Sequence, residues 1–288
     1  MTTQHAGLST PDYLVVGHVT KDVTPDGFLF GGTVSFCSLT AQKLGLQAAV
    51  LTRCEELPEL RDYLAGVGLH IVPSDETTTF ENVYTRAGRT QRIGPVAPPI
   101  PIGAVPEVWR TVPVVHLGPV SQEVPPELAD VFPPSTVIGA TPQGWMRAWD
   151  EAGRVRYAPW HNALKVLSRV DALIFSPEDV GGDVELVRHY CEMAKLAVVT
   201  DRHNGCVVWH SGRQDRQPAF DVEEVDPTGA GDVFATAFLV RYGESQDPLD
   251  AAEFANCAAS FIVEGRGTTV LPTRERVEQR LKHGKRRT

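Results

Sequence analysis

The sequence has few cysteines, and none are arranged as in a disulfide framework or a zinc site. Its five cysteines are odd in number and widely spaced, and they contain no Cys-x-x-Cys pair. The nine histidines also lack the His-x-x-x-His and His-Glu-x-x-His spacings of metal sites. We therefore expect the cysteines to be small core residues and assign no metal to the histidines. The cysteines are Cys37, Cys54, Cys191, Cys206 and Cys257.

An excess of basic charge and long apolar runs are also missing. The 288 residues carry 36 acidic and 27 basic side chains, a formal net charge of −9, which argues against a nucleic-acid or anionic-membrane partner. No window reaches the roughly 20 apolar residues of a membrane span, and residues 1–12 lack the apolar core of a signal peptide. We expect a cytoplasmic protein, and we interpret the short basic tail, 282–287, as a solvated C-terminus.

Three common nucleotide and hydrolase signatures are absent. The sequence contains no Gly-x-x-x-x-Gly-Lys-Ser/Thr, no Gly-x-Gly-x-x-Gly after a strand and no Gly-x-Ser-x-Gly. The phosphate-loop, dinucleotide-binding and α/β-hydrolase interpretations therefore lack support. The composition, 42% apolar and 22% charged, is that of a packed globular protein.

Short apolar runs alternate with helical patterns along most of the chain. Such alternation predicts an α/β fold with a mainly parallel sheet. The expected strands are 13–16, 48–52, 69–72, 112–117, 136–140, 172–175 and 196–200, and the expected helical stretches include 33–44 and 184–194. A hairpin of 206–210 and 216–222, joined through Ser211-Gly212, is expected before the final helices.

The segment from Thr77 to Ile93 has a different pattern, with mixed polar and apolar residues on both sides of Arg86-Ala87-Gly88. This pattern predicts a hairpin in a separate small sheet, which we interpret as a lid. The prolines between Pro95 and Pro106 exclude regular helix and indicate an extended connection back to the main body.

The most informative segment is Asp226-Pro227-Thr228-Gly229-Ala230-Gly231-Asp232, directly before an apolar set with helical spacing. Free amides and the helix dipole at such a start can bind a phosphate, and glycines let it approach the backbone. Asp232 in the first turn could accept a proton from an attacking hydroxyl, although the dipole should lower its pKa. The alternative from spacing alone is that this Asp only caps the helix.

The same segment, with Phe234 after it, resembles the C-terminal signature of the ribokinase-like carbohydrate kinases, or phosphofructokinase-B family. The resemblance extends along nearly the whole chain in order, through Gly17-x4-Asp22, Gly31-Gly32, Lys43-Leu44-Gly45, and Val198-Val199-Thr200 with Gly205. It implies one ribokinase-like domain, 1–288, a three-layer α/β/α sandwich with a small β-sheet lid from about 18–32 and 77–106. It also implies ATP, Mg²⁺ and, near the anion hole, K⁺.

The resemblance assigns roles by position. For catalysis it implies Asp232 as the base and the amides of Gly229, Ala230 and Gly231 as the anion hole. For the acceptor it implies Asp22, Gly31, Gly32 and Gln143, because a carboxylate can accept two hydrogen bonds from vicinal hydroxyls. For the nucleotide it implies Thr200, Gly205, Thr228 and Asn256, and for metals Asp179 and Glu178 (Mg²⁺) and Asp226 (a monovalent cation). For Asp22 the alternative is a surface Asp in a turn, and for Asn256 an exposed polar residue of a helix that Asp247 caps.

Three departures from the family pattern narrow the acceptor. Phe36 stands where the family commonly has a sugar-binding Asn, Ser176-Pro177-Glu178-Asp179 replaces Asn-x-x-Glu, and Arg202 replaces a glycine. The segments 31–36, 78–81 and Gln143-x-x-x-Arg147 resemble the myo-inositol kinases, whose substrate Asp22, Gln143 and Glu81 or Asn82 could bind. An alternative for Arg147 is a structural ion pair.

The resemblance thus predicts an ATP-dependent kinase for a small polyol, most of all myo-inositol. The alternatives are a kinase for another sugar, a sugar acid or a nucleoside, and a nucleotide-binding regulator without turnover, which the altered Mg²⁺ motif would favour. The lid also allows a homodimer.

Overall fold

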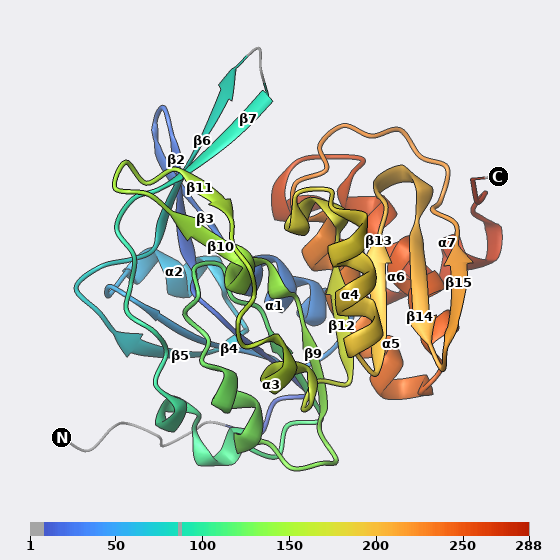
Figure 1. Ribbon diagram of the computed structural model, residues 1–288, viewed down its shortest axis with the longest axis horizontal. Helices are drawn as coiled ribbons and strands as arrows, with labels where there is room; N and C mark the ends of the chain where they lie inside the picture. The colour runs from blue at the N-terminus through green and yellow to red at the C-terminus, as the bar shows by residue number, and fades with distance from the viewer. Residues whose placement is uncertain (1–8, 86–87, 288) are drawn as a thin grey trace.

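The protein, described by a computed structural model over residues 9–85 and 88–287, is built on one large sheet with helices on both faces (Figure 1). Side chains are described outside 83–89, and Arg86 and Ala87 of the expected hairpin turn lie outside the described residues. The large sheet has the strand order β15-β14-β13-β12-β9-β8-β1-β4-β5. Its strands are β1 (Tyr13–Val16), β4 (Ala48–Cys54), β5 (Gly68–Pro73), β8 (Val114–Leu117), β9 (Val137–Ala140), β12 (Ala172–Phe175), β13 (Leu196–Thr200), β14 (Cys206–His210) and β15 (Arg213–Gln217).

The pairing in this sheet is parallel from β13 to β5, and only β14 and β15 at one edge add antiparallel pairs. All four residues of β1, β8 and β12 are buried, as expected for central strands, and only His116 in β8 interrupts their apolar runs. This confirms the expected α/β sandwich with a mainly parallel sheet.

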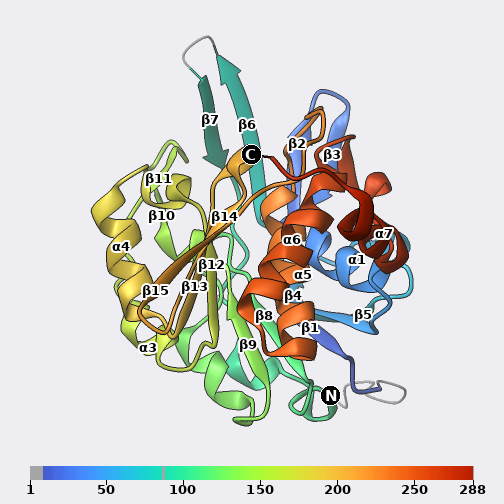
Figure 2. The same cartoon turned by 90° about the vertical axis from the view of Figure 1, so that its right-hand side faces the viewer.

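Two helical layers cover the sheet, and Figure 2 shows α1, α5, α6 and α7 on one face and α3 and α4 on the other. The helices are α1 (Thr33–Lys43), α2 (Pro58–Tyr63), α3 (Ala163–Leu167), α4 (Val184–Met193), α5 (Ala230–Ser245), α6 (Pro248–Ile262) and α7 (Arg274–His283). Short 3-10 helices are η1 (Ile102–Ala104), η2 (Glu107–Trp109), η3 (Pro126–Val131), η4 (Pro142–Met146), η5 (Pro177–Val180), η6 (Arg202–Asn204) and η7 (Gly267–Val270). The five cysteines are free and buried in these layers, as expected.

A second, four-stranded sheet stands beyond one end of the large sheet, where β6 and β7 project from the body (Figures 1 and 2). It has the order β3-β2-β6-β7 and contains β2 (Thr20–Thr24), β3 (Gly27–Gly31), β6 (Thr79–Thr85) and β7 (Gly88–Ile93). A further pair, β10 (Arg147–Trp149) and β11 (Val155–Tyr157), lies beside it, with Arg154 bridged to Arg92. The four-stranded sheet is called the small sheet below, and its role as a lid is taken up as a proposal.

The hairpin after β13 differs from the expectation. Its second strand is Arg213–Gln217, not 216–222, because the two-residue turn Ser211-Gly212 has positive φ at both positions, 50° and 73°, and joins the strands at once. Pro218 then ends the ladder, since proline has no amide to donate.

The basic tail is also not simply solvated. It runs beside 219–222, where the Asp221 amide donates to the Lys285 carbonyl and the Arg287 amide to the Ala219 carbonyl, both at 2.8 Å. The Arg286 guanidinium lies over the Phe220 ring and pairs with Glu253 at 2.6 Å. These partners hold the tail against the body, which charge pattern alone could not predict.

Candidate active site

The predicted anion hole lies at the start of α5. Gly229 is the N-cap, with φ of 81°, and the helix begins at Ala230 because Val233 and the apolar residues after it are buried against the sheet. The Ala230 amide already donates to the Pro227 carbonyl at 3.1 Å. Within the described part of the chain, the Gly229 and Gly231 amides have no acceptor. Of the three amides predicted to form the anion hole, these two therefore remain available to a phosphate.

Gly229 is also held by packing. A Cβ built on it would lie 2.4 Å from the Phe36 ring, which is far inside van der Waals contact. The aromatic residue that replaces the expected sugar-binding Asn thus packs on the first glycine of the helix start. Gly231 is different, because a Cβ there would meet nothing within 4 Å.

Asp232 lies in the first turn of α5 and is partly buried. Desolvation raises its pKa to about 6, and the Thr33 hydroxyl and the Arg147 charge oppose this rise, while Asp179 and Asp22 add to it. The expected lowering of the pKa is therefore wrong, because loss of solvent outweighs the helix dipole. A carboxyl that titrates near neutral pH suits proton transfer at cellular pH.

Asp22 is on β2, and its charge is among those that raise the pKa of Asp232. The Thr20 hydroxyl donates to Asp22 Oδ1 at 3.0 Å. A Cβ on Gly31 would lie 2.3 Å from Asp22 Oδ2, and one on Gly32, with φ of 82°, would lie 2.6 Å from the His18 carbonyl oxygen. The two glycines therefore allow the backbone to pass close to Asp22 and His18, and direct contact with an acceptor stays a prediction.

Gln143 and Asp179 are in direct contact with each other. Gln143 Nε2 donates to Asp179 Oδ1 at 2.9 Å, and Asp179 Oδ2 accepts from the Ser176 amide at 2.8 Å and its hydroxyl at 3.1 Å. Sequence reasoning placed the first residue with the acceptor and the second with the metal. The structure brings both into one hydrogen-bonded group whose carboxylate influences Asp232.

Glu178 points elsewhere, into an ion pair with Arg202, whose Nε lies 2.6 Å from its Oε1. Arg202 has φ of 48°, the left-handed conformation for which the family uses glycine. Among the described residues, no group of three or more His, Cys, Asp or Glu side chains could hold a metal ion. Asp179 fits a single carboxylate ligand of Mg²⁺, which keeps waters and phosphate oxygens as its other ligands, whereas Glu178 does not fit.

The residues predicted for the nucleotide lie around the end of β13. Thr200 is partly buried and its hydroxyl reaches the Phe175 carbonyl at 3.4 Å, and Gly205 has φ of 95° with no room for a Cβ beside the Gln217 carbonyl. Asn256 on α6 is buried and donates to the same carbonyl at 3.2 Å, so the alternative of an exposed residue is wrong. Asp226 accepts from the Thr228 amide at 2.9 Å and shapes the turn before α5.

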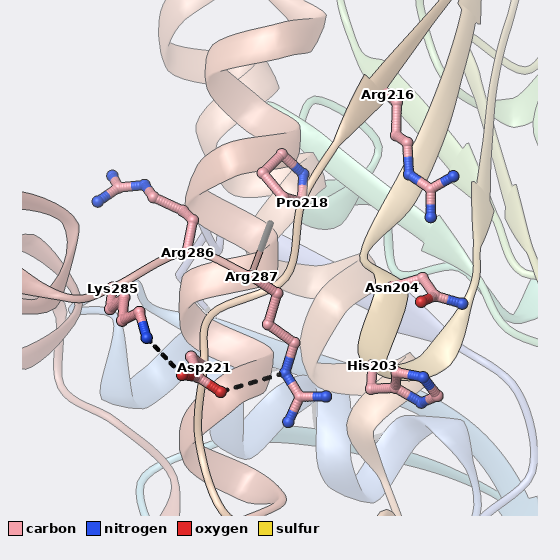
Figure 3. Close-up of a pocket in the computed structure, with 8 residues that line it drawn as sticks. All are labelled: His203, Asn204, Arg216, Pro218, Asp221, Lys285, Arg286 and Arg287. Atoms are coloured by element: carbon pink, nitrogen blue, oxygen red, sulfur yellow. Dashed lines mark ion pairs between the residues drawn. The ribbon is translucent and has the colours of Figure 1, made fainter.

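A cavity of about 640 Å³ opens beside this region (Figure 3). The loop 203–204, the strand end at Arg216 to Pro218 and the basic tail line it. Its only carboxylate among the lining residues, Asp221, pairs with Lys285 at 3.4 Å and Arg287 at 3.6 Å. This leaves an excess of positive charge around the cavity.

Sequence reasoning did not find four polar residues near the site. Thr33 bonds to Asp232, and His18, Thr78 and Glu123 are buried where the two sheets join. Thr33 and Thr78 lie in the segments 31–36 and 78–81 that the resemblance marked, and Glu123 is a charged residue between the apolar stretch 112–120 and Val124, but none was assigned a role. No spacing rule connects residues so distant in sequence.

Comparisons with known proteins show which proteins the chain is similar to. Residues 169–274 match the pfkB family of carbohydrate kinases. The chain is 28% identical to the inositol 3-kinase of Arabidopsis thaliana over 209 residues, which cover 68% of this chain and 58% of that enzyme. The chain therefore matches little more than half the length of this relative.

Solved structures give longer matches. A pyrophosphate-dependent kinase in the ribokinase family, solved with sulfate, is 25% identical, with a TM-score of 0.75 over 92% of this chain and 99% of that one. Another structure of such a kinase, complexed with a pyrophosphate analogue and myo-inositol, is 24% identical, with a TM-score of 0.74 over 93% and 99%. In the described residues, no helix is both long and apolar enough to cross a membrane.

Proposed function

We propose that this chain, of which residues 169–274 match the pfkB family of carbohydrate kinases, is a kinase of that family and transfers the γ-phosphoryl group of ATP to a hydroxyl of a small polyol, most of all myo-inositol. The observation that best supports the proposal is the arrangement of groups at the start of α5. There a carboxyl with a pKa of about 6 shares one helical turn with the two free amides of Gly229 and Gly231.

In the proposed reaction the acceptor hydroxyl oxygen attacks the terminal phosphorus in line, and the bond from phosphorus to the bridging oxygen breaks. Asp232 takes the hydroxyl proton, and ADP leaves with the bridging oxygen. The Gly229 and Gly231 amides donate to the phosphoryl oxygens, whose charge they stabilise in a place already desolvated. Asp22 accepts hydrogen bonds from neighbouring hydroxyls of the acceptor and so sets which oxygen faces Asp232.

Mg²⁺ would arrive with the donor phosphates and neutralise their charge. Asp179 would hold it, with Gln143 and Ser176 orienting that carboxylate. Asp226, Thr228, Thr200, Gly205 and Asn256 are proposed to border the donor, and K⁺ near Asp226 is part of the same proposal.

A second candidate donor is inorganic pyrophosphate. The likeness to a pyrophosphate-dependent kinase favours it, and so does Arg202, which places a guanidinium where a nucleotide-binding chain has glycine. Among acceptors, another sugar, a sugar acid or a nucleoside remain alternatives to myo-inositol. A regulator without turnover would need Asp232 to be dispensable.

One experiment separates these candidates. Each of ATP and pyrophosphate is supplied with Mg²⁺ to the wild type and to Asp232→Asn, with myo-inositol and a panel of sugars, sugar acids and nucleosides as acceptors. We expect acceptor-stimulated, Asp232-dependent product formation, strongest with myo-inositol. If no acceptor stimulates turnover that depends on Asp232, the kinase proposal fails.

We propose further that the small sheet is a lid over the acceptor and that it allows a homodimer. β3 is an edge strand of this sheet, and Leu29 on it is 66% exposed, as are Val23 and Phe28 to a lesser degree. Sedimentation analysis should then show a dimer that Leu29→Glu dissociates. A monomeric wild type would remove the dimer from the proposal and leave the lid.

A further inference from the structure

His18 lies where the chain passes between the two sheets. The chain crosses between the two sheets in four segments, called passages below. They are 17–19 before β2, 31–32 after β3, 74–78 before β6 and 94–98 after β7. His18 is itself in the first and fully buried. Its carbonyl oxygen lies against Gly32, its Nδ1 is 2.8 Å from Thr78 Oγ1 and its Nε2 is 3.2 Å from the Pro98 carbonyl. One residue thus contacts all the passages.

The hydrogen bonds of the His18 ring have one consistent direction. A carbonyl oxygen can only accept, so Nε2 carries the proton and donates to Pro98, and burial lowers the pKa of the ring, which keeps it neutral. Nδ1 must then accept, and the nearest donor is the Thr78 hydroxyl. That hydroxyl in turn accepts from the Ala97 amide at 3.1 Å. The second hairpin of the small sheet is therefore tied to the first passage at both its ends.

Glu123 fixes the same point to the large sheet. Its buried carboxylate accepts from the His18 amide at 2.8 Å, the Val120 amide at 2.9 Å, and the Ser121 amide at 2.7 Å and hydroxyl at 3.2 Å. All these partners are donors, so the position requires a group that only accepts. A glutamine would place its NH₂ group against one of these donors.

This junction is close in sequence to, and in contact with, residues proposed for the acceptor site. Asp22 follows His18 by four residues on β2 and pairs with Phe80, which follows Thr78 by two residues on β6. The Arg147 guanidinium lies over the Phe80 ring at 5.3 Å and donates to the Val120 carbonyl at 3.0 Å. The loop that holds Glu123 is thus in contact with both the small sheet and a charge that acts on Asp232.

We propose that His18 and Glu123 are positioning residues of the acceptor site, which hold the small sheet at the angle that brings Asp22 to the acceptor. They touch neither substrate nor the reacting atoms. The inference rests on the proposed kinase function, since it concerns the acceptor half of that site. It requires that disturbing the junction affects the acceptor and leaves the donor.

The test compares His18→Phe and Glu123→Gln with Thr136→Val. The control removes one buried hydroxyl that donates to the Val112 carbonyl at 2.8 Å, near the opposite end of the large sheet. In the junction variants we expect KM for the acceptor to rise on the order of tenfold and acceptor-independent donor hydrolysis to increase, because a buried group loses its partner. The KM for the donor should change less than about twofold. His18→Gln, which keeps an N–H for Pro98, should recover part of the loss.

Amide hydrogen exchange gives a readout that needs no turnover. In the junction variants exchange should accelerate in β2, β3 and β6 while β8 and β9 stay protected. Equal exchange, together with a KM for the acceptor no higher than in Thr136→Val, would overturn the inference. Absence of Asp232-dependent turnover in the wild type would instead count against the proposed function, and exchange would still decide whether the junction holds the small sheet. If His18→Phe does not fold, His18→Gln and Glu123→Gln carry the same comparison.

Discussion

The acceptor side and the donor side of the proposed site are built differently. On the acceptor side, Thr20, Thr33, Thr78 and His18 are buried and bonded to one another or to Asp22 and Asp232. On the donor side, the side chains of Arg202 and Glu178 are 74% and 64% exposed and face mainly each other. Exposed ion pairs contribute little to stability, whereas buried polar networks restrict geometry. We infer that acceptor recognition is fixed by the fold, whereas the Arg202 part of donor recognition, unlike the buried Asn256, is open to change at the surface.

The largest expected effect is at the point where the two sides meet. Asp232→Asn should lower kcat by about 10³-fold or more, because it removes the proton acceptor. In the wild type, kcat should fall as pH decreases through about 6, since the base becomes protonated. Steady-state rates from pH 5 to 8 check this. The control is Asp62→Asn, which removes an exposed carboxylate on α2 and should leave kcat and its pH dependence unchanged. A wild-type rate that stays flat through pH 6 would count against Asp232 as the base.

The same variant should also be more stable than the wild type. The folded-state pKa of Asp232 is raised above its unfolded value, so the ionised carboxyl costs stability above pH 6 and costs nothing below about pH 4. With allowance for partial exposure, Asp232→Asn should gain on the order of 1–2 kcal/mol at pH 8, and the gain should vanish near pH 4. Urea unfolding at both pH values measures it. A gain of equal size at pH 4 would show that another cause is responsible.

A matched pair of glycines tests the anion hole. Gly229→Ala should lower kcat by about 10²-fold and destabilise the fold, because φ is positive and the new methyl group would meet Phe36. Gly231→Ala has open space and should gain about 0.5–1 kcal/mol in helix stability. Because the Gly231 amide is proposed to bind the phosphoryl group, the methyl group should also raise KM for the donor in Gly231→Ala. Thermal unfolding and kinetics with both variants separate strain from lost donor contact.

Asp22→Asn tests the acceptor side alone. The uncharged amide should weaken the hydrogen bonds to acceptor hydroxyls and raise KM for the acceptor about 10- to 100-fold, with KM for the donor nearly constant. Kinetics with each substrate varied in turn provide the measurement. Equal changes in both constants would mean that the two sides are coupled more tightly than their structures indicate.

The smallest effect is expected at the donor side. Arg202→Gly removes an exposed ion pair and restores the residue that suits φ of 48°, so stability should change by less than about 1 kcal/mol. The ratio of rates with ATP and pyrophosphate should shift a few-fold toward ATP. Glu178→Gln, which frees Arg202, should shift the ratio toward pyrophosphate. No shift in either variant would remove Arg202 from donor recognition.

Signals from residues close together in the sequence predicted much of the fold. Asp247 accepts from the Leu249 and Asp250 amides and caps α6 as its position before Pro248 predicts. The start of α5 was predicted for the same reason, because its glycines and the helical spacing of the apolar residues after them are neighbours in the sequence. The second strand of the last hairpin and the basic tail were misjudged because each depends on partners fixed elsewhere, the turn at Ser211 and the segment 219–222.

For the candidate site, residue types were predictable and their surroundings were not. Burial in the folded protein raises the pKa of Asp232, and the Thr33 hydroxyl, about 200 residues away in sequence, partly opposes the rise; neither effect can be read from the helix start alone. Likewise Gln143 and Asp179 were assigned to different roles, and only the fold shows that they bond to each other. Their contacts with substrates stay predictions.

The junction at His18 also bears on how the chain reaches its fold during synthesis. Its hydrogen bonds join residues 60, 80 and 105 positions apart, to Thr78, Pro98 and Glu123. Contacts of such long separation form late, because the intervening loops must close first. A ribosome would have to release the chain beyond residue 123 before β2 and β6 could settle against the large sheet, so Asp22 would reach its place only after nearly half of the protein has emerged.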